Sequence, residues 1–179
     1  MTASSPSSPS SPLPSPLALE SHSAEATERI GAELAQFLRP GDVITLDGDL
    51  GAGKTAFTRG LARGLGLSSP IASPTFTIVS EHLAEQEDRL SLYHFDVYRL
   101  SDADDFLDSG LDEYLYRDGV SVLEWGEIVA DALPEDVIRI TLQGTGDIRT
   151  IRLAVPEEKR PILARLRGAL LGIPDVRIL

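Results

Sequence analysis

The chain has 179 residues, of which 42% are hydrophobic, a length that supports one globular domain with a core of its own. It contains no cysteine and only three histidines, which excludes disulfides, cysteine nucleophiles and a zinc site built from these residues alone. The formal net charge of −12 argues against a protein that coats nucleic acid by itself, because Lys and Arg contacts to phosphate supply most of that affinity.

The N-terminal segment has a composition of its own. Ser and Pro dominate it, so residues 1–18 are predicted to form a disordered tail ahead of a single domain over residues 19–179. A proline-rich ligand segment is the functional alternative for this tail. The segment lacks the basic and apolar regions of a secretory signal, and the sequence has no apolar run long enough to span a bilayer. We therefore expect a cytoplasmic protein.

The first predicted elements alternate between helix and strand. Apolar residues repeat at helical spacing over residues 24–38, where a Pro-Gly pair ends the pattern. The segment VITLD at 43–47 is short, β-branched and apolar, which is typical of a strand buried on both faces of a parallel sheet. We expect it at the centre of the sheet. Apolar residues at every fourth position from Phe57 predict a second helix directly after the glycine-rich segment that follows this strand.

Further strands are predicted at 75–79, 92–97 and 120–124. A short helix is predicted in SDADDFLDSG, where Ser101 and Asp104 form a capping-box pattern. The segments VIRITL and IRTIRLAV, joined by QGTGD, predict a hairpin at the sheet edge, followed by a helix over about 157–171. This alternation indicates an α/β fold with a mostly parallel central sheet and an antiparallel hairpin at its edge.

The segment GDLGAGKT, residues 48–55, fits the phosphate-binding pattern G-x-x-x-x-G-K-[ST] at every defined position. It also lies between a predicted strand and a predicted helix, as that pattern requires, which points to a three-layer P-loop NTPase fold. The glycines let successive backbone N–H groups turn inward and form an anion cradle at the positive end of the helix. A glycine-rich turn that binds nothing is the alternative. The nucleotide-binding residues predicted here are Asp49, Leu50, Gly51, Ala52, Gly53, Lys54, Thr55 and Ala56.

The loop also predicts the chemistry of its ligand. Lys54, one of only two lysines, is expected to place its ammonium against the terminal phosphates, and Thr55 to offer its hydroxyl to Mg²⁺. The sequence has no Asn, so the guanine-specific N-K-x-D motif is absent and ATP is favoured over GTP.

Two predicted strands end in polar residues. Glu124 closes the strand at 120–124, the place of a carboxylate that binds Mg²⁺ in such sites, although a solvated strand end would look the same. Alternation puts His94 and Asp96 on one face of the strand at 92–97. The residues leave open whether hydrogen bonds satisfy these two side chains or whether the two orient water and metal.

Five segments, GDLGAGKT, SPTFT, YHFDVYRL, DSGLDEYL and LEWGE, resemble in order and interval the TsaE (YjeE) family over roughly residues 20–145. That family is the small bacterial P-loop ATPase required for forming N6-threonylcarbamoyladenosine in tRNAs that read ANN codons. The resemblance implies an ATPase that uses Mg²⁺, is weak alone and is coupled to a complex of the proteins TsaD and TsaB. It also implies that this protein contacts tRNA only indirectly, through that complex.

The same resemblance implies individual roles. Lys54, Asp96 and Glu124 would be catalytic, with Asp96 as the family's essential aspartate that positions water or metal. Thr55 and Glu124 would hold Mg²⁺, and Trp125 would pack beside the nucleotide unless it is an ordinary core residue. The segment SPTFT would be switch-like, with Thr75 and Thr77 as polar contacts and with Phe76 where relatives often carry Tyr.

Two other functions stay open on the sequence. One is a nucleotide-gated adaptor, in which ATP binding alone orders a partner surface. The other is a small-molecule kinase, which requires an Arg-rich lid, whereas Arg99 and Arg117, between the predicted strands at 92–97 and 120–124, are isolated arginines. The acidic segment SDADDFLDSGLDE is either a docking face or a solvated surface.

Overall fold

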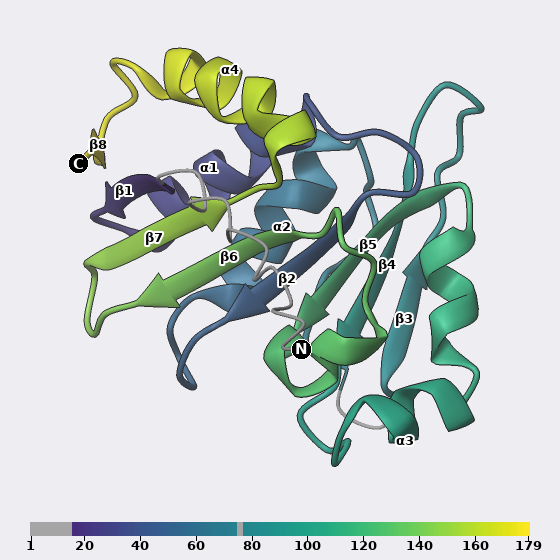
Figure 1. The fold of residues 1–179 in the computed structure, drawn as a ribbon. Helices are drawn as coiled ribbons and strands as arrows, with labels where there is room; N and C mark the ends of the chain where they lie inside the picture. Colours follow the sequence, from purple (N-terminus) through teal and green to yellow (C-terminus); the bar gives the residue numbers. More distant parts are fainter. Residues whose placement is uncertain (1–15, 75–76) are drawn as a thin grey trace, which may run out of the picture.

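The computed structural model describes residues 16–74 and 77–179, which form one sheet with helices on both of its faces (Figure 1). The strands are β1 (Leu17–Ser21), β2 (Val43–Asp47), β3 (Val79–His82), β4 (Ser91–Asp96), β5 (Gly119–Glu124), β6 (Ile138–Gln143), β7 (Arg149–Ala154) and β8 (Val176–Ile178). The α-helices are α1 (Ala24–Ala35), α2 (Lys54–Gly64), α3 (Ala103–Asp108) and α4 (Arg160–Leu170). Three short 3-10 helices complete the described elements: η1 (Leu111–Tyr116), η2 (Gly126–Ala132) and η3 (Glu157–Lys159).

The strand order is β3-β4-β5-β2-β6-β7-β1-β8. The four inner strands β4, β5, β2 and β6 are parallel, and every pairing outside them is antiparallel. Strand β2 pairs on both sides, so that Leu46 lies opposite Glu124 on one side and Ile140 on the other. Its first four residues are buried, as expected of a strand covered on both faces. The predicted central position of VITLD is confirmed.

Two layers of helices cover the sheet (Figure 1). Helices α1, α2 and α4 bury their apolar faces against one side, where Ile30, Phe57 and Leu166 are fully enclosed. On the other side, α3 and the short helices η1 and η2 enclose a smaller core that includes Phe95 and Phe106. The predicted three-layer α/β architecture of a P-loop NTPase is confirmed.

Helices α1 and α2 lie with their backbones in contact. A Cβ atom added to Gly60 would lie 2.0 Å from the carbonyl oxygen of Glu28, and one added to Gly31 would lie 2.4 Å from that of Phe57. Glycine at these places lets the two helices approach more closely than side chains would allow. The close approach fixes α2, which carries the predicted phosphate-binding Lys54 at its first position.

Three predicted boundaries differ from the structure. The helix expected over 24–38 ends at Ala35, because the chain turns there while Leu38 still reaches the core and so prolongs the apolar pattern. The strand expected at 75–79 is wrong: β3 begins only at Val79, since Thr77 and Ile78 line a pocket, and 75–76 lie outside the described residues. The short acidic helix α3 is capped by Asp102 in place of Ser101, because the Asp102 carboxylate accepts from the Asp105 N–H.

The chain ends also differ from expectation. The predicted hairpin is confirmed as β6 and β7, but the sheet continues beyond it through β1 and β8. Leu17 and Ala18, assigned to the tail, form the start of β1, where Leu17 lies opposite Leu153. The rest of the predicted tail, 1–15, lies outside the described residues. Within the described ranges, no helix has the length and apolar character needed to cross a membrane.

Candidate nucleotide-binding site

The loop between β2 and α2 has a backbone that requires glycine. Gly48, Gly51 and Gly53 all have positive φ angles, of 147°, 80° and 102°. At Gly48 a Cβ atom would also lie 2.2 Å from the carbonyl oxygen of Leu142. Gly53 is the N-cap of α2 and offers no side-chain hydrogen bond to the first turn. The amides at the start of α2 are therefore left for a ligand, at the helix end that favours anions.

The Lys54 side chain is held inside this loop. Its Nζ donates to the carbonyl oxygens of Gly48 and Asp49, at 2.5 and 3.0 Å, and lies 3.9 Å from the ring centroid of Trp125. Lys54 is only 5% exposed. Burial lowers the pKa of Lys54, while the carboxylates of Glu124 and Asp96 oppose this shift by favouring the charged form. The ammonium thus lies between a π face, main-chain oxygens and nearby negative charge.

Trp125 takes its place through an unusual backbone conformation. Its φ angle of 64° is left-handed, which is uncommon for a residue other than glycine. Its N–H donates to the carbonyl oxygen of Leu46, directly beyond the end of β5. The indole lies 5.0 Å from the ring of Tyr98, between centroids, and over Lys54. The expected place of Trp125 beside a nucleotide stays a prediction; the contact that the structure shows is with Lys54.

Polar side chains converge beside the start of α2. The Thr55 hydroxyl lies 2.7 Å from the hydroxyl of Ser73 and donates to Glu124 Oε1 at 3.2 Å. The same Oε1 atom lies 2.9 Å from His94 Nε2. Glu124 belongs to β5 and His94 to β4, and neither side chain is more than 4% exposed. The carboxylate is thus enclosed by the protein and opens only toward the cleft that it lines.

A cleft of about 360 Å³ joins these groups. Two of the predicted nucleotide-binding residues do not line it: Ala52 is buried in the core, and Asp49 contributes a carbonyl oxygen to Lys54. Leu50 lines it at the rim, with its side chain 92% exposed. The residues that line the cleft are Leu50, Gly51, Gly53, Lys54, Thr55, Ala56, Arg59, Ser73, Asp96, Glu124 and Trp125.

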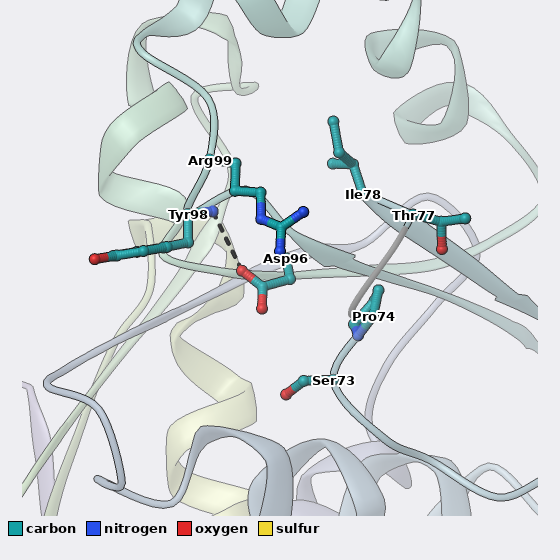
Figure 2. A pocket seen from close by; sticks show the side chains of 7 residues that line it. All are labelled: Ser73, Pro74, Thr77, Ile78, Asp96, Tyr98 and Arg99. Atoms are coloured by element: carbon teal, nitrogen blue, oxygen red, sulfur yellow. Dashed lines mark hydrogen bonds between the residues drawn. The ribbon is translucent and has the colours of Figure 1, made fainter.

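A second pocket, of about 220 Å³, adjoins the cleft and shares Ser73 and Asp96 with it (Figure 2). One carboxylate oxygen of Asp96 accepts from the Tyr98 N–H at 3.2 Å. Figure 2 shows the Arg99 side chain reaching toward Asp96 from the same loop. Thr77, a predicted contact, lines this pocket and not the cleft, whereas Thr75 lies outside the described residues.

A family model described as threonylcarbamoyl adenosine biosynthesis protein TsaE matches residues 21–151. The chain belongs to the TsaE family. A curated TsaE protein of Treponema pallidum is 49% identical over 71% of this chain and 91% of its own length. A curated TsaE protein of Bacillus subtilis is 46% identical over 69% of this chain and 75% of its own length. The crystal structure of Bacillus subtilis YdiB superimposes with a TM-score of 0.72 at 36% identity, over 89% of this chain and 99% of that one.

The donors of this TsaE-family site suit a magnesium ion that arrives with a nucleotide. Thr55 and Glu124 present oxygen atoms 3.2 Å apart, and oxygen is the ligand that Mg²⁺ prefers. The described residues hold no cluster of three or more His, Cys, Asp or Glu that could bind a metal alone. One or two protein oxygens completed by phosphates and water is the usual pattern for Mg²⁺. The residues therefore fit the ion as part of a nucleotide complex.

Sequence reasoning missed two members of the site. Ser73 opens the segment SPTFT, in which only the threonines were singled out, yet its hydroxyl is the one that meets Thr55. Arg59, which the predicted site did not include, lies one turn beyond Thr55 and lines the cleft. For His94, the structure shows a hydrogen bond with Glu124, at 2.9 Å from Nε2 to Oε1; whether the pair orients water or metal stays a prediction.

Proposed function

We propose that this protein is a Mg²⁺-dependent ATPase of the cytoplasm that supports formation of threonylcarbamoyladenosine in tRNAs reading ANN codons. Family membership supports the pathway. The observation on which the ATPase proposal rests is the convergence in one cleft of the loop lysine, a hydroxyl and two carboxylates, from Lys54, Thr55, Glu124 and Asp96. A P-loop with these groups is the arrangement that phosphoryl transfer to water requires.

Each residue has a task that follows from its position. The amides at the start of α2 bind the phosphate chain, and the Lys54 ammonium turns from its loop carbonyls toward the terminal phosphates. Thr55 and Glu124 hold Mg²⁺, which when bound offsets the charge that develops on the phosphate oxygens. Asp96, at the end of β4 and in register with Glu124 on the neighbouring β5, orients the attacking water through its carboxylate.

The proposed partners are TsaD and TsaB, with tRNA reached only through their complex. Among the described residues that line the cleft, the cationic side chains are Lys54 and Arg59. P-loop enzymes with little positive charge of their own commonly receive more from a partner, so turnover by this chain alone should be slow. The net charge of −12 favours contact with proteins over direct contact with RNA.

Reconstituted threonylcarbamoyl transfer with TsaD and TsaB tests the proposal. We expect transfer to need this protein, Lys54→Met to abolish its effect, and ATP turnover to rise when the partners are added. Absence of binding to the partners, with unchanged turnover, would refute it. Asp96→Asn tests the adaptor alternative: if this variant binds nucleotide and partners and still supports transfer without hydrolysis, the protein acts as a nucleotide-gated adaptor.

A further inference from the structure

The Glu124 carboxylate receives two contacts on the same oxygen. His94 Nε2 lies 2.9 Å and Thr55 Oγ1 lies 3.2 Å from Oε1. Among the described residues, none makes a hydrogen bond to the second oxygen of this carboxylate, which leaves that oxygen for a ligand in the cleft that Glu124 lines. Thr55 sits at the edge of the cleft and is itself a candidate ligand of Mg²⁺. His94 can reach Glu124 because β4 and β5 are neighbouring parallel strands, in which His94 lies opposite Val122, two residues before Glu124.

One protonation pattern of the His94 ring fits these surroundings. An ionised carboxylate only accepts hydrogen bonds, so Nε2 must donate to Glu124. The other nitrogen, Nδ1, is buried and meets no partner among the described residues. A proton on Nδ1 would be an unsatisfied donor in the protein interior, which is costly. The contact to Glu124 therefore requires a proton on Nε2, whereas Nδ1 meets no partner among the described residues.

We propose that His94 is a positioning residue for Glu124, whose carboxylate its Nε2–H holds in the orientation that presents the free oxygen to the Mg²⁺ of a bound nucleotide. The inference rests on the proposed function, because it assumes that Glu124 meets Mg²⁺ there. His94 itself contacts neither metal nor phosphate in this role. Hydrogen-bond partners of metal ligands change metal affinity by about 10- to 100-fold when they are removed.

The neighbouring strand β3 offers a matched control. His82 is also a buried histidine on a strand, and its Nε2 also lacks a partner among the described residues. Its Nδ1, however, lies 2.7 Å from the Ser69 hydroxyl and not next to Glu124. Replacing His82 removes a buried imidazole from the sheet while the contact to Glu124 stays intact.

The first test is a calorimetric titration of Mg²⁺ at fixed ATP. We expect His94→Leu to need roughly tenfold or more Mg²⁺ for the same gain in ATP affinity, with its ATP affinity in EDTA unchanged. His94→Gln, whose amide can donate from a similar distance, should restore most of the loss, and His82→Leu should titrate like the wild type. A wild-type Mg²⁺ titration for His94→Leu, or an equal loss in both leucine variants, would overturn the proposal.

The second test detects the hydrogen bond between His94 and Glu124 directly, in the absence of nucleotide and metal. Nitrogen NMR of the full chain labelled at histidine should show the Nε2–H form for His94, with a shift that changes in Glu124→Ala and not in Ser69→Ala. An Nε2 atom without a proton would overturn the proposal whatever the nucleotide results. Failure of the wild type to bind MgATP would instead refute the proposed function, and the ring proton would still decide whether His94 holds Glu124.

Discussion

Lys54 is the residue at which the loop, the cleft and the aromatic ring meet. Its ammonium is surrounded by two carbonyl oxygens, the Trp125 ring and the carboxylates that line the cleft. A compact ammonium on a flexible stem can exchange the two carbonyl oxygens for phosphate oxygens and stay over the Trp125 ring, whereas the planar guanidinium of Arg needs a different geometry. This explains why a chain rich in arginine keeps lysine here.

Replacing Lys54 should remove tight nucleotide binding. We expect Lys54→Met to raise the Kd for MgATP by about 10- to 100-fold, because a charge-assisted contact to the phosphates is lost. Calorimetry measures the change. Lys159→Met is the matched control, since it removes the only other lysine, which contacts Asp42 and Asp136 outside the cleft. Equal affinities for Lys54→Met and the wild type would contradict the prediction.

The ring of Trp125 should contribute to the same affinity. Trp125→Leu is expected to raise the Kd for MgATP about two- to thirtyfold, the range of a partly desolvated cation–π contact. Trp125→Phe keeps a π face, so its loss of MgATP affinity should be smaller than that of Trp125→Leu. Both variants place a non-glycine residue at the same left-handed backbone position, so backbone strain is matched between them. Equal affinities of the two variants would show that the π face is irrelevant.

Most of the candidate site could be predicted because its residues belong to a contiguous motif or end a strand. Lys54, Thr55, Glu124 and Asp96 were found in this way, and the structure brings all four together. Ser73 could not be singled out, since its contact with Thr55 depends on how a loop without regular structure crosses the cleft.

Among the helices, the contact between α1 and α2 fixes the position of the first turn of α2, where the glycine-rich loop joins the helix. Glycines in both helices let backbone meet backbone, so α2 has little freedom to shift without opening the core beneath Phe57 and Leu61. The apolar pattern of α2 was visible in the sequence, but the role of its interior Gly60 was not, because glycine contributes nothing to a hydrophobic pattern.

Gly60→Ala should destabilise the fold by about 1–3 kcal/mol, because the new methyl group would overlap the backbone of α1. Urea unfolding measures the change. Gly168→Ala is the matched control on α4, where a Cβ atom meets nothing within 4 Å. Its higher helix propensity should raise the free energy of unfolding by up to about 1 kcal/mol. If Gly60→Ala were as stable as Gly168→Ala, the contact between the helices would be looser than described.

For the molecule as a whole, Lys159, directly before α4, links two loops that lead into neighbouring strands of the sheet. Lys159 Nζ lies 2.8 Å from Asp42 Oδ1, just before β2, and 2.9 Å from Asp136 Oδ2, just before β6. Burial lowers the pKa of Lys159, but the hydrogen bonds that its ammonium donates to the Asp42 and Asp136 carboxylates outweigh burial, so that the pKa is raised above its ordinary value of 10.5.

This raised pKa gives stability a defined pH dependence. Because the folded pKa exceeds the unfolded value, the contribution is fully present below about pH 10.5 and is lost as the pH rises through the folded pKa. Lys159→Met should lower the free energy of unfolding by about 1.5–3 kcal/mol near neutral pH. Its difference from the wild type should shrink above about pH 10.5 in chemical unfolding. A difference that stays constant into that range would contradict the assignment.

The central strands of the sheet could be predicted from the sequence, whereas the strands β1 and β8 at one edge could not. Strands β2 and β5 are rich in apolar, β-branched residues, and β4 carries large apolar side chains; a parallel sheet buries such segments. Strands β1 and β8 are short and half-buried, and they are strands only because β7 and β1 respectively offer a free edge to them. Pairing of this kind between the two ends of a chain leaves no local pattern.

The pairing of β1 with β8 makes the first and last strands hydrogen-bonded neighbours, and the Leu179 N–H also donates to the Ala18 carbonyl oxygen at 3.0 Å. Strands β7 and β6 separate β1 from β2, whose end leads into the phosphate loop. A circularly permuted gene that joins these ends through a short linker and opens the chain elsewhere should keep the cleft intact. The same geometry lets a fluorophore or a surface tether be attached at Leu179 for single-molecule work without touching the nucleotide.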